Sequence, residues 1–206
     1  MINLIEKFFF KKRVVFCTSS EPKQYSISEE FSFQVIEDIK QINHYPELRI
    51  SSVVKSRLIS GNWILFVSKN NKNNEIAAYY WAVTGKNLNY WHDNFIVQPG
   101  TALLCNAFVK NEYRQQGLYK FLIYKSHEYL FQKNIQKVFT VVENSNTNSL
   151  KANRSAGLSV YYTNYLLKLF GFNVFSIFKK SSGVVMILFG SKLFKSIIYN
   201  QKLSDA

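Results

Sequence analysis

The chain has 206 residues, 47% of them hydrophobic and 17% aromatic, which excludes an intrinsically disordered protein. Its 26 basic and 13 acidic residues give a formal net charge of +13, which favours an anionic partner such as a phosphorylated ligand, nucleic acid or an anionic lipid surface. The two cysteines, Cys17 and Cys105, lie in separate apolar runs, so neither a disulfide framework nor a zinc site is predicted. No stretch reaches the ~20 apolar residues of a membrane span, and we predict one cytoplasmic domain over residues 1–206.

Both ends of the chain combine lysines with large apolar side chains. Residues 2–10 are predicted to form one or two helical turns, and the first strand is expected at 13–17. At the other end, residues 193–198 are predicted to form a short helix within a basic, aromatic segment that covers 159–206. Each end is expected either to pack onto the domain or to contact the inner face of a membrane.

The N-terminal half is predicted to contain two helices and a hairpin. Ser28 is followed by two acids and by apolar residues at near-helical spacing as far as Ile42, which predicts a helix that ends at Pro46. A second helix is expected over residues 51–60. Two apolar strands within residues 62–83 are separated by a polar turn, which is typical of a β-hairpin.

Residues 101–158 carry the most informative pattern of the chain. The predicted elements are, in order, an apolar strand at 101–109, a polar turn at 110–117, a helix at 118–132, a strand at 137–142 and a helix that closes at Gly157. The first strand shows no polar alternation, as expected when both faces are buried. His127 is predicted to lie on the solvated side of the first helix.

The turn between that first strand and its helix has the features of an anion site. A strand that passes directly into a helix points unpaired N–H groups and the positive end of the helix dipole at one spot. Gly117 allows close approach of a ligand to the backbone, and Arg114 offers donors for phosphate oxygens. The turn is neither a Walker A loop nor a dinucleotide-binding GxGxxG.

The sequence Arg114-Gln-Gln-Gly-Leu-Tyr119 resembles the coenzyme A loop of the GNAT superfamily of N-acyltransferases, Arg/Gln-x-x-Gly-x-Gly/Ala. Glu112 and Tyr113 precede the arginine as in the family, and Asn146 stands eleven residues before Gly157, as in the family's second motif. The resemblance implies an α+β fold, with a twisted mixed sheet of six or seven strands and helices on both faces. Residues 101–158 would form its cofactor-binding core.

The resemblance also implies which residues bind acetyl-coenzyme A. The strands at 101–109 and 137–142, on either side of the helix at 118–132, would splay apart. The pantetheine amides would then form hydrogen bonds with the exposed backbone of the strand at 101–109. The expected cofactor-binding residues are Asn106, Ala107, Phe108 and Val109 on that strand, Arg114, Gln115, Gln116, Gly117, Leu118 and Tyr119 around the pyrophosphate, and Asn146 near the thioester.

Two residues depart from the family pattern. Tyr119 replaces the last Gly/Ala of the loop, and either narrows the approach to the phosphates or turns its ring outward. Asn153 stands where many members carry the tyrosine that protonates the leaving thiolate, and an amide cannot act as that acid. Either Tyr161, Tyr162 or water would take this role.

Catalysis would also need a base for the acceptor amine. The candidate base is Glu143, which directly follows the predicted strand at 137–142. Alternatively, Glu143 is only an exposed carboxylate at the end of that strand. The Gly-Leu-Tyr ending of the loop and the run from Tyr165 to Gly171 resemble GNAT members of surface-polysaccharide pathways. The expected acceptor is therefore an amino-sugar nucleotide, bound by a monomer or homodimer.

Two other functions remain open at this point. The departures at Tyr119 and Asn153 would suit a GNAT-like module that binds coenzyme A without turnover. The high positive charge would suit a protein that binds a membrane or nucleic acid surface. No DNA-recognition module is evident, so nucleic acid is the less expected partner.

Overall fold

The computed structural model describes residues 8–18, 25–45, 52–85, 90–92, 95–169, 172–180 and 185–189. The predicted helical turns before residue 8, the expected helix end at Pro46 and the predicted helix at 193–198 lie outside these residues. Residues 8–10, also expected in the first helical turns, belong to a strand instead.

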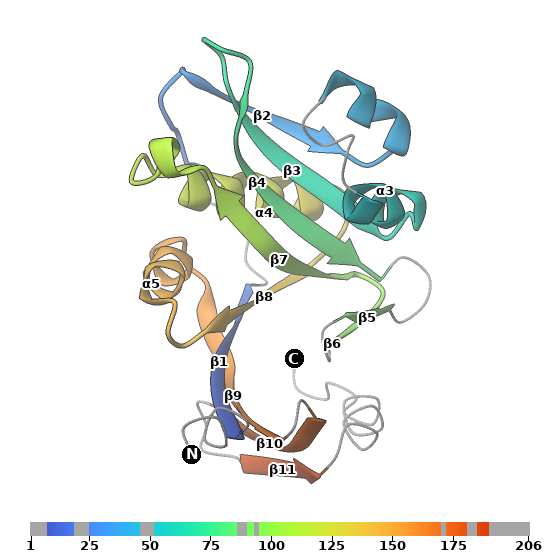
Figure 1. The fold of residues 1–206 in the computed structure, drawn as a ribbon, viewed down its shortest axis with the longest axis vertical. Helices are drawn as coiled ribbons and strands as arrows, with labels where there is room; N and C mark the ends of the chain where they lie inside the picture. Colours follow the sequence, from blue (N-terminus) through green and yellow to red (C-terminus); the bar gives the residue numbers. More distant parts are fainter. Residues whose placement is uncertain are drawn as a thin grey trace.

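Nine strands form one mixed sheet, in the order β11-β10-β9-β1-β8-β7-β4-β3-β2 (Figure 1). They are β1 (Phe8–Thr18), β2 (Phe31–Ile36), β3 (Trp63–Asn70), β4 (Ile76–Thr84), β7 (Thr101–Val109), β8 (Lys137–Glu143), β9 (Ser159–Leu169), β10 (Phe172–Lys180) and β11 (Val185–Phe189). A separate pair is formed by β5 (Tyr90–His92) and β6 (Phe95–Val97). The predicted α+β class is confirmed, and the sheet is larger than the six or seven strands expected.

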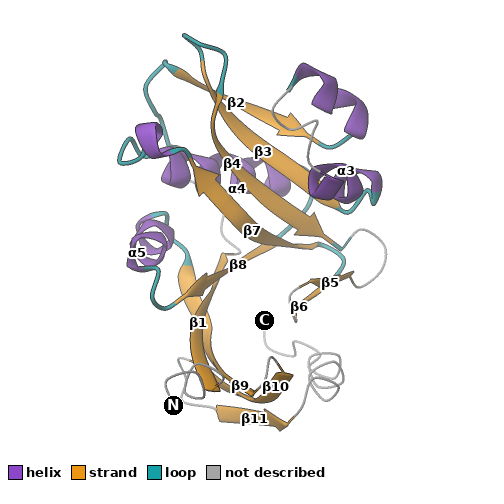
Figure 2. Cartoon of the chain, viewed as in Figure 1, coloured by secondary structure: helices purple, strands orange, loops and turns teal. Residues whose placement is uncertain are grey.

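Helices lie on both faces of the part of the sheet formed by β2, β3, β4 and β7 (Figure 2). On one face, α4 (Leu118–Gln132) and α5 (Thr147–Ser155) contribute to a core that contains Phe66 and Tyr80. On the other face, the 3-10 helix η1 (Ile39–His44) and α3 (Ser52–Ile59) pack over a second core around Trp63 and Trp81. Because both faces are covered, every residue of β3 is buried, and the predicted hairpin and second helix are confirmed.

The helix predicted from Ser28 is wrong. Residues 31–36 form β2, which pairs antiparallel with β3 from Phe31 opposite Asn70 to Ile36 opposite Leu65. Phe31, Phe33 and Val35 alternate along the strand and pack on the α4 side. The sequence after β2 does turn helical, but only for η1, whose N-cap Asp38 accepts the Lys40 N–H at 2.8 Å. Pairing with β3 therefore outweighed the local helix signals.

His127 of α4 also differs from its prediction, because its side chain is only 7% exposed. Burial lowers the pKa of its imidazole below the usual 6.5, and its Nε2 has no hydrogen-bond partner among the described residues. The helix packs over more than a single stripe of its surface, since Tyr124 and His127 are buried along with the expected apolar sector. Within the described part of the chain, no helix has the length and hydropathy to span a bilayer.

Candidate functional site

The two central parallel strands pair over only part of their length. The register of β7 with β8 runs from Thr101 opposite Lys137 to Leu104 opposite Thr140 and stops there. Beyond this point β7 continues to Val109 and β8 to Glu143, and the two strands diverge (Figure 1). The backbones of the two strands therefore separate in the middle of the sheet, as the resemblance implied, and we call this separation the wedge.

The free half of β7 is shaped differently from the paired half. One extra residue bulges from the strand between its pairs with Tyr79 and Trp81, and Asn106 takes a positive φ of 54° there. Residues 106–108 are exposed, and Phe108 leaves 43% of its surface uncovered. A bulge next to an unpaired edge offers backbone N–H and C=O groups to an extended ligand. The expectation that residues 101–109 are buried on both faces therefore holds only for the first half.

The polar turn leads from this open edge to the N-terminus of α4. Gly117 is the N-cap with φ 80°, and Gln115 also adopts a positive φ of 65°. No side chain caps the helix, so the N–H groups of its first turn point outward without an intrahelical partner. Together with the helix dipole, these N–H groups favour an anion at this end, which is where the sequence predicts an anion site.

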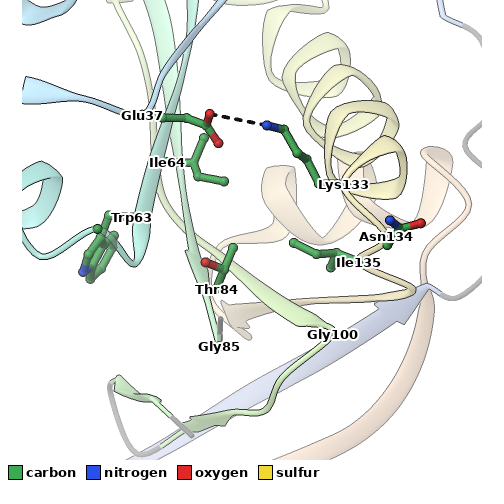
Figure 3. A pocket seen from close by; sticks show the side chains of 10 residues that line it. Glu37, Trp63, Ile64, Thr84, Gly85, Gly100, Lys133, Asn134 and Ile135 are labelled. Atoms are coloured by element: carbon green, nitrogen blue, oxygen red, sulfur yellow. Dashed lines mark ion pairs between the residues drawn. The ribbon is translucent and has the colours of Figure 1, made fainter. Parts of the chain in front are cut away.

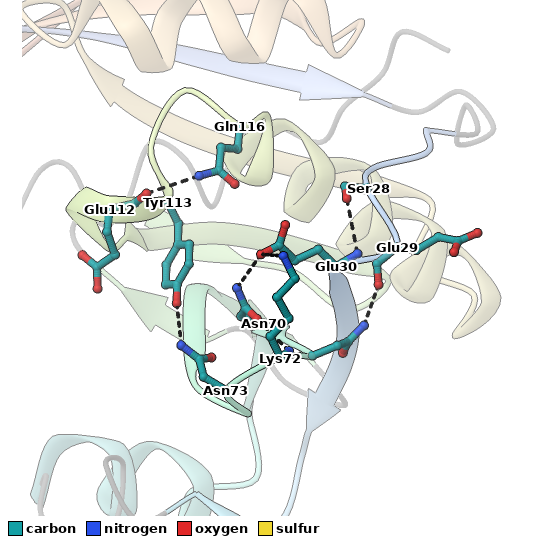
Figure 4. A network of polar contacts seen from close by, with 10 residues as sticks. Ser28, Glu29, Glu30, Asn70, Lys72, Asn73, Glu112, Tyr113 and Gln116 are labelled. Carbon is teal, nitrogen blue, oxygen red and sulfur yellow. Dashed lines mark hydrogen bonds and ion pairs between the residues drawn. The ribbon is translucent and has the colours of Figure 1, made fainter.

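A network of polar contacts holds this turn in place (Figure 4). The Tyr113 hydroxyl accepts a hydrogen bond from Asn73 Nδ2 at 2.9 Å, and its ring meets the edge of Phe31 at 5.8 Å. Gln116 Nε2 donates to the Glu112 carbonyl at 3.2 Å. The turn is thus fixed against the β3–β4 hairpin and β2, which keeps the anion-binding end formed in advance.

The Arg114 side chain lies beside the same turn. Its Nε donates to the carbonyl of Val109 at 3.3 Å, which places the guanidinium between the open end of β7 and the N-terminus of α4. The remaining guanidinium donors suit phosphate oxygens, so Arg114 fits the role that the resemblance implies.

Two residues that the sequence analysis missed also flank the turn. The Tyr25 hydroxyl lies 2.9 Å from the position that a Cβ on Gly117 would take. The Lys120 ammonium stands 4.8 Å from the centre of the Tyr25 ring, which stacks on Tyr124 at 5.1 Å. Lys120 thus brings a positive charge to the first turn of α4. Tyr25 carries no pattern that could have predicted its place, because only the tertiary fold brings it to α4.

The two residues that depart from the family pattern touch each other. Tyr119 turns inward, which excludes the outward ring, one of the two alternatives for this residue, and its ring meets that of Tyr80 at 5.7 Å. Asn153 Nδ2 donates to the Tyr119 hydroxyl at 3.1 Å and to the Ser149 carbonyl at 2.8 Å. The pair bridges α4 and α5 on the side where β7 and β8 separate.

Tyr80 connects this pair to the point where the strands part. Its hydroxyl lies 2.9 Å from that of Thr140, the last residue of β8 that pairs with β7. Burial raises the pKa of Tyr80 well above its usual range, and the nearby Tyr119 hydroxyl adds to this shift. Contacts between the hydroxyl groups of Thr140, Tyr80 and Tyr119 therefore connect the wedge to Asn153 of α5.

Three other predicted site residues lie farther from the turn or have a partner already. Asn146 is the N-cap of α5, and its Oδ1 accepts the Ser149 N–H at 3.1 Å. Tyr161 and Tyr162 lie on β9, which β1 separates from β8. Burial raises the pKa of both phenols, which makes them weaker proton donors at neutral pH.

Glu143 lies at the diverging end of β8. It is exposed, and Arg13 is its cross-strand neighbour on β1. Alternation along β8 places Glu143 on the same face as Phe139 and Val141, which pack in the second core beneath α3. The carboxylate therefore belongs to the face of the wedge opposite α4.

Arg57 of α3 reaches the wedge from that same face. Its guanidinium carbon stands 4.3 Å from the ring centre of Trp63 and 5.1 Å from that of Trp81. With the Asn106 amide oxygen turned toward α3, the two terminal nitrogens of Arg57 donate to it at 2.7 and 3.2 Å. Within the part of the chain that the structure describes, no carboxylate pairs with Arg57. The guanidinium is therefore held in place without a carboxylate partner among these residues.

A cavity of about 450 Å³ lies elsewhere on the domain, at the C-terminal end of α4 (Figure 3). Its lining includes Glu37 and Lys133, which form an ion pair at 3.6 Å, and Gly100 before β7. The helix dipole disfavours anions at this end, and Asn106 in the bulge of β7 is roughly 20 Å from Gly100 along the strand. The wedge and the N-terminus of α4 are therefore the better candidate for an anionic ligand.

Comparisons with known proteins agree with this geometry. A family model described as the acetyltransferase (GNAT) family matches residues 33–157, more than half of the chain. No curated protein matches the chain. The resemblance found in the sequence is therefore confirmed at the level of the family.

Solved structures show the same fold at low identity. A GCN5-related N-acetyltransferase from Sphaerobacter thermophilus superposes with a TM-score of 0.54 at 14% identity, over 81% of this chain and 54% of that one. An acetyltransferase of the GNAT family from Colwellia psychrerythraea gives 0.54 at 14% identity, over 79% and 57%. A tandem GNAT protein from the clavulanic acid biosynthesis pathway gives 0.52 at 15% identity, over 74% and 51%. The chain thus spans about half the length of these proteins.

Proposed function

Because the chain belongs to the GNAT acetyltransferase family, we propose that it transfers an acetyl group from acetyl-coenzyme A to a primary amine. The observation that carries this proposal is the wedge between β7 and β8, which opens at the same end of the sheet as the uncapped N-terminus of α4. An extended amide-bearing arm and a pyrophosphate would then bind at neighbouring places.

The residues around the wedge fit acetyl-coenzyme A as the donor. The first-turn N–H groups of α4 and the side chains of Arg114 and Lys120 would hold the pyrophosphate. The exposed backbone of residues 106–109 would bind the pantetheine amides, and covering Phe108 would remove apolar surface from water. The bound donor supplies an activated acyl group, and the chain supplies its orientation toward the amine.

For the acceptor we propose a primary amine on an anionic molecule, with an amino-sugar nucleotide of surface-polysaccharide biosynthesis as the leading example. Arg57 would bind its phosphate, since the guanidinium is fixed by two tryptophans and Asn106. Tyr79 and Phe108 stack at 5.3 Å on the same face and provide an aromatic surface for a sugar or base. Glu143 would take the proton of the amine from the β8 side.

The donor site can be tested with two glycines that have similar backbone conformations. Gly117 and Gly100 have φ values of 80° and 74°, so a glutamate strains the backbone alike at either position and adds the same charge. The two sites differ in space, because the new Cβ lies 2.9 Å from the Tyr25 hydroxyl at Gly117 and meets no atom within 4 Å at Gly100. Only Gly117 lies at the N-terminus of α4, whereas Gly100 lies at the other end of β7. Gly117→Glu should weaken binding of acetyl-coenzyme A by about 100-fold or more, and Gly100→Glu should leave it nearly unchanged.

Calorimetric titration of both folded variants and of the unmodified protein measures this difference. Equal affinities in the three proteins would place the donor site elsewhere. If the unmodified protein binds, a panel of amines should then be screened by mass spectrometry for the acetylated product. The panel should contain UDP-linked amino sugars, amino-sugar phosphates, uncharged amino sugars and polyamines, and an exclusive preference for polyamines would contradict the proposed anionic acceptor.

A further inference from the structure

Tyr119 and Asn153 are each unusual for the family, and the hydrogen bond between them relates the two departures. Asn153 occupies the position of the family's acidic tyrosine on α5, and Tyr119 sends a phenol toward that position from α4. On the basis of the proposed function, we propose that the Tyr119 hydroxyl is the proton donor to the departing sulfur and that Asn153 is its positioning residue.

The direction of the hydrogen bond supports this assignment. Asn153 Nδ2 is a donor, so the Tyr119 oxygen accepts this bond and the Tyr119 proton is left for another acceptor. That acceptor is either the Tyr80 hydroxyl, which also hydrogen-bonds with Tyr119, or a bound ligand. When that proton leaves, the same N–H bond stabilises the negative oxygen as a charge-assisted hydrogen bond. The amide thus favours the product of proton donation.

The surroundings of Asn153 fit a side chain that positions a neighbour by hydrogen bonding better than one that only fills space. It is fully buried, and its Oδ1 has no hydrogen-bond partner among the residues described. Leaving a buried polar atom unpaired costs free energy that an aliphatic side chain would avoid. The amide N–H, with Tyr119 and the Ser149 carbonyl as its two acceptors, is the part of the side chain that the surroundings use.

The other phenols near the wedge are less suited to this role. Tyr80 is buried to 1% exposure, and its hydroxyl is already bonded to that of Thr140. Tyr161 and Tyr162 lie two strands from the wedge on β9. Tyr119 retains partial exposure and lies at the junction of α4 and α5, beside the point where β7 leaves β8.

The proton balance of the step is complete without a further reactant. The acceptor nitrogen bonds to the acyl carbon while the carbon–sulfur bond breaks and its electron pair stays on sulfur. Tyr119 gives its proton to that sulfur, and the nitrogen loses a proton to Glu143 or water. Solvent returns a proton to the Tyr119 oxygen, so an amine and a thioester give an amide and a thiol.

The decisive variant is Tyr119→Phe, with Tyr124→Phe as its matched control. Tyr124 is also on α4, and its hydroxyl donates to the Ser155 carbonyl of α5 at 3.3 Å, so both changes remove one phenol oxygen from the same helix pair. Tyr119→Phe should lower kcat by about 100-fold and leave the dissociation constant of coenzyme A within about threefold. Tyr124→Phe should leave both values nearly unchanged.

A spectroscopic readout separates proton donation from packing. The thiol of bound coenzyme A can be titrated through the ultraviolet absorbance of its thiolate, which requires no acceptor or turnover. Because the Tyr119 hydroxyl would stabilise the thiolate by donating to it, Tyr119→Phe should shift this titration upward by about one pH unit. In Tyr119→Phe/Asn153→Tyr, a phenol on α5 should restore at least about a tenth of the lost kcat.

The outcomes distinguish this inference from the proposed function. If the unmodified protein neither binds coenzyme A nor acetylates an amine, the proposed function fails. If it does both, and Tyr119→Phe keeps the same kcat and thiol titration, only the role of Tyr119 fails. Tighter binding of coenzyme A by Tyr119→Phe, with kcat retained, would also overturn the inference, because it would show that the phenol obstructs the wedge.

Discussion

The two halves of β7 have the same apolar sequence character and opposite surroundings. Residues 101–104 pair with β8, and all but the half-buried Thr101 are buried, with Leu104 only 1% exposed. Residues 105–109 do not pair with β8 and include the bulge at Asn106, and the Phe108 residue among them is 43% exposed. One half stabilises the domain, and the other half forms an edge to which a ligand can add.

The difference shows how a sheet can contain a binding site at its centre. An exposed strand edge favours aggregation, and proteins usually cover it or place it at the rim of the sheet. Here the edge is internal, between β7 and β8. The turn at the end of the same strand leads to the uncapped N-terminus of α4, which favours an anion and would orient a ligand bound at this edge.

The largest expected effect is a difference in how much the two halves of β7 contribute to the free energy of unfolding. Leu104→Ala should lower the free energy of unfolding by about 3 kcal/mol, because it leaves a cavity in the paired half. Phe108→Ala should lower it by only about 1 kcal/mol, since the ring is partly exposed and its main contact is the stack on Tyr79. Urea denaturation followed by circular dichroism measures both values. Equal losses would mean that the second half of β7 is packed as the first is.

A second prediction concerns the α3 face of the open half. Arg57→Gln should raise the KM for an anionic acceptor about tenfold and leave the dissociation constant of acetyl-coenzyme A unchanged. Lys55→Gln removes the same charge from an exposed position of the same helix and serves as the control. Steady-state kinetics at two salt concentrations would measure the effect. Equal KM changes in both variants would mean that Arg57 contributes only its positive charge and makes no specific contact with the acceptor.

Local patterns predicted the parts of the fold that depend on local signals. The strand–turn–helix unit from Thr101 to Gln132 has its apolar run, its glycine and its helical period in one continuous stretch. The helix predicted from Ser28 failed because apolar residues at 31, 33, 35 and 36 fit both a helix and an alternating strand. Only the pairing of β2 with β3, far apart in sequence, decides between the two.

The candidate site was predicted only where the chain itself brings its residues together. Arg114 and Gly117 are near neighbours and lie where the motif placed them. Tyr25, Arg57 and Tyr80 reach the site from separate elements, and no local pattern marks them. The sequence showed two departures from the family, and only the packing of α4 on α5 shows that they touch.

The smallest expected effect concerns the buried His127 of α4. His127 has a lowered pKa because it is buried, so below its ordinary value of 6.5 the unfolded chain binds a proton that the folded chain does not. The contribution of His127 to the free energy of unfolding should therefore fall between pH 7.5 and pH 5.5, by at most about 1.4 kcal/mol, and should be constant above pH 7.5.

His127→Phe should flatten this slope, because it removes the titrating group and the unpartnered Nε2 together. The control is Glu128→Gln on the same helix, which breaks an exposed ion pair with Lys125 at 2.7 Å and should change stability by only a few tenths of a kcal/mol. Denaturant melts at both pH values measure the slopes. An unchanged slope in His127→Phe would assign the pH dependence to other groups and would mean that the imidazole is hydrated in the folded protein.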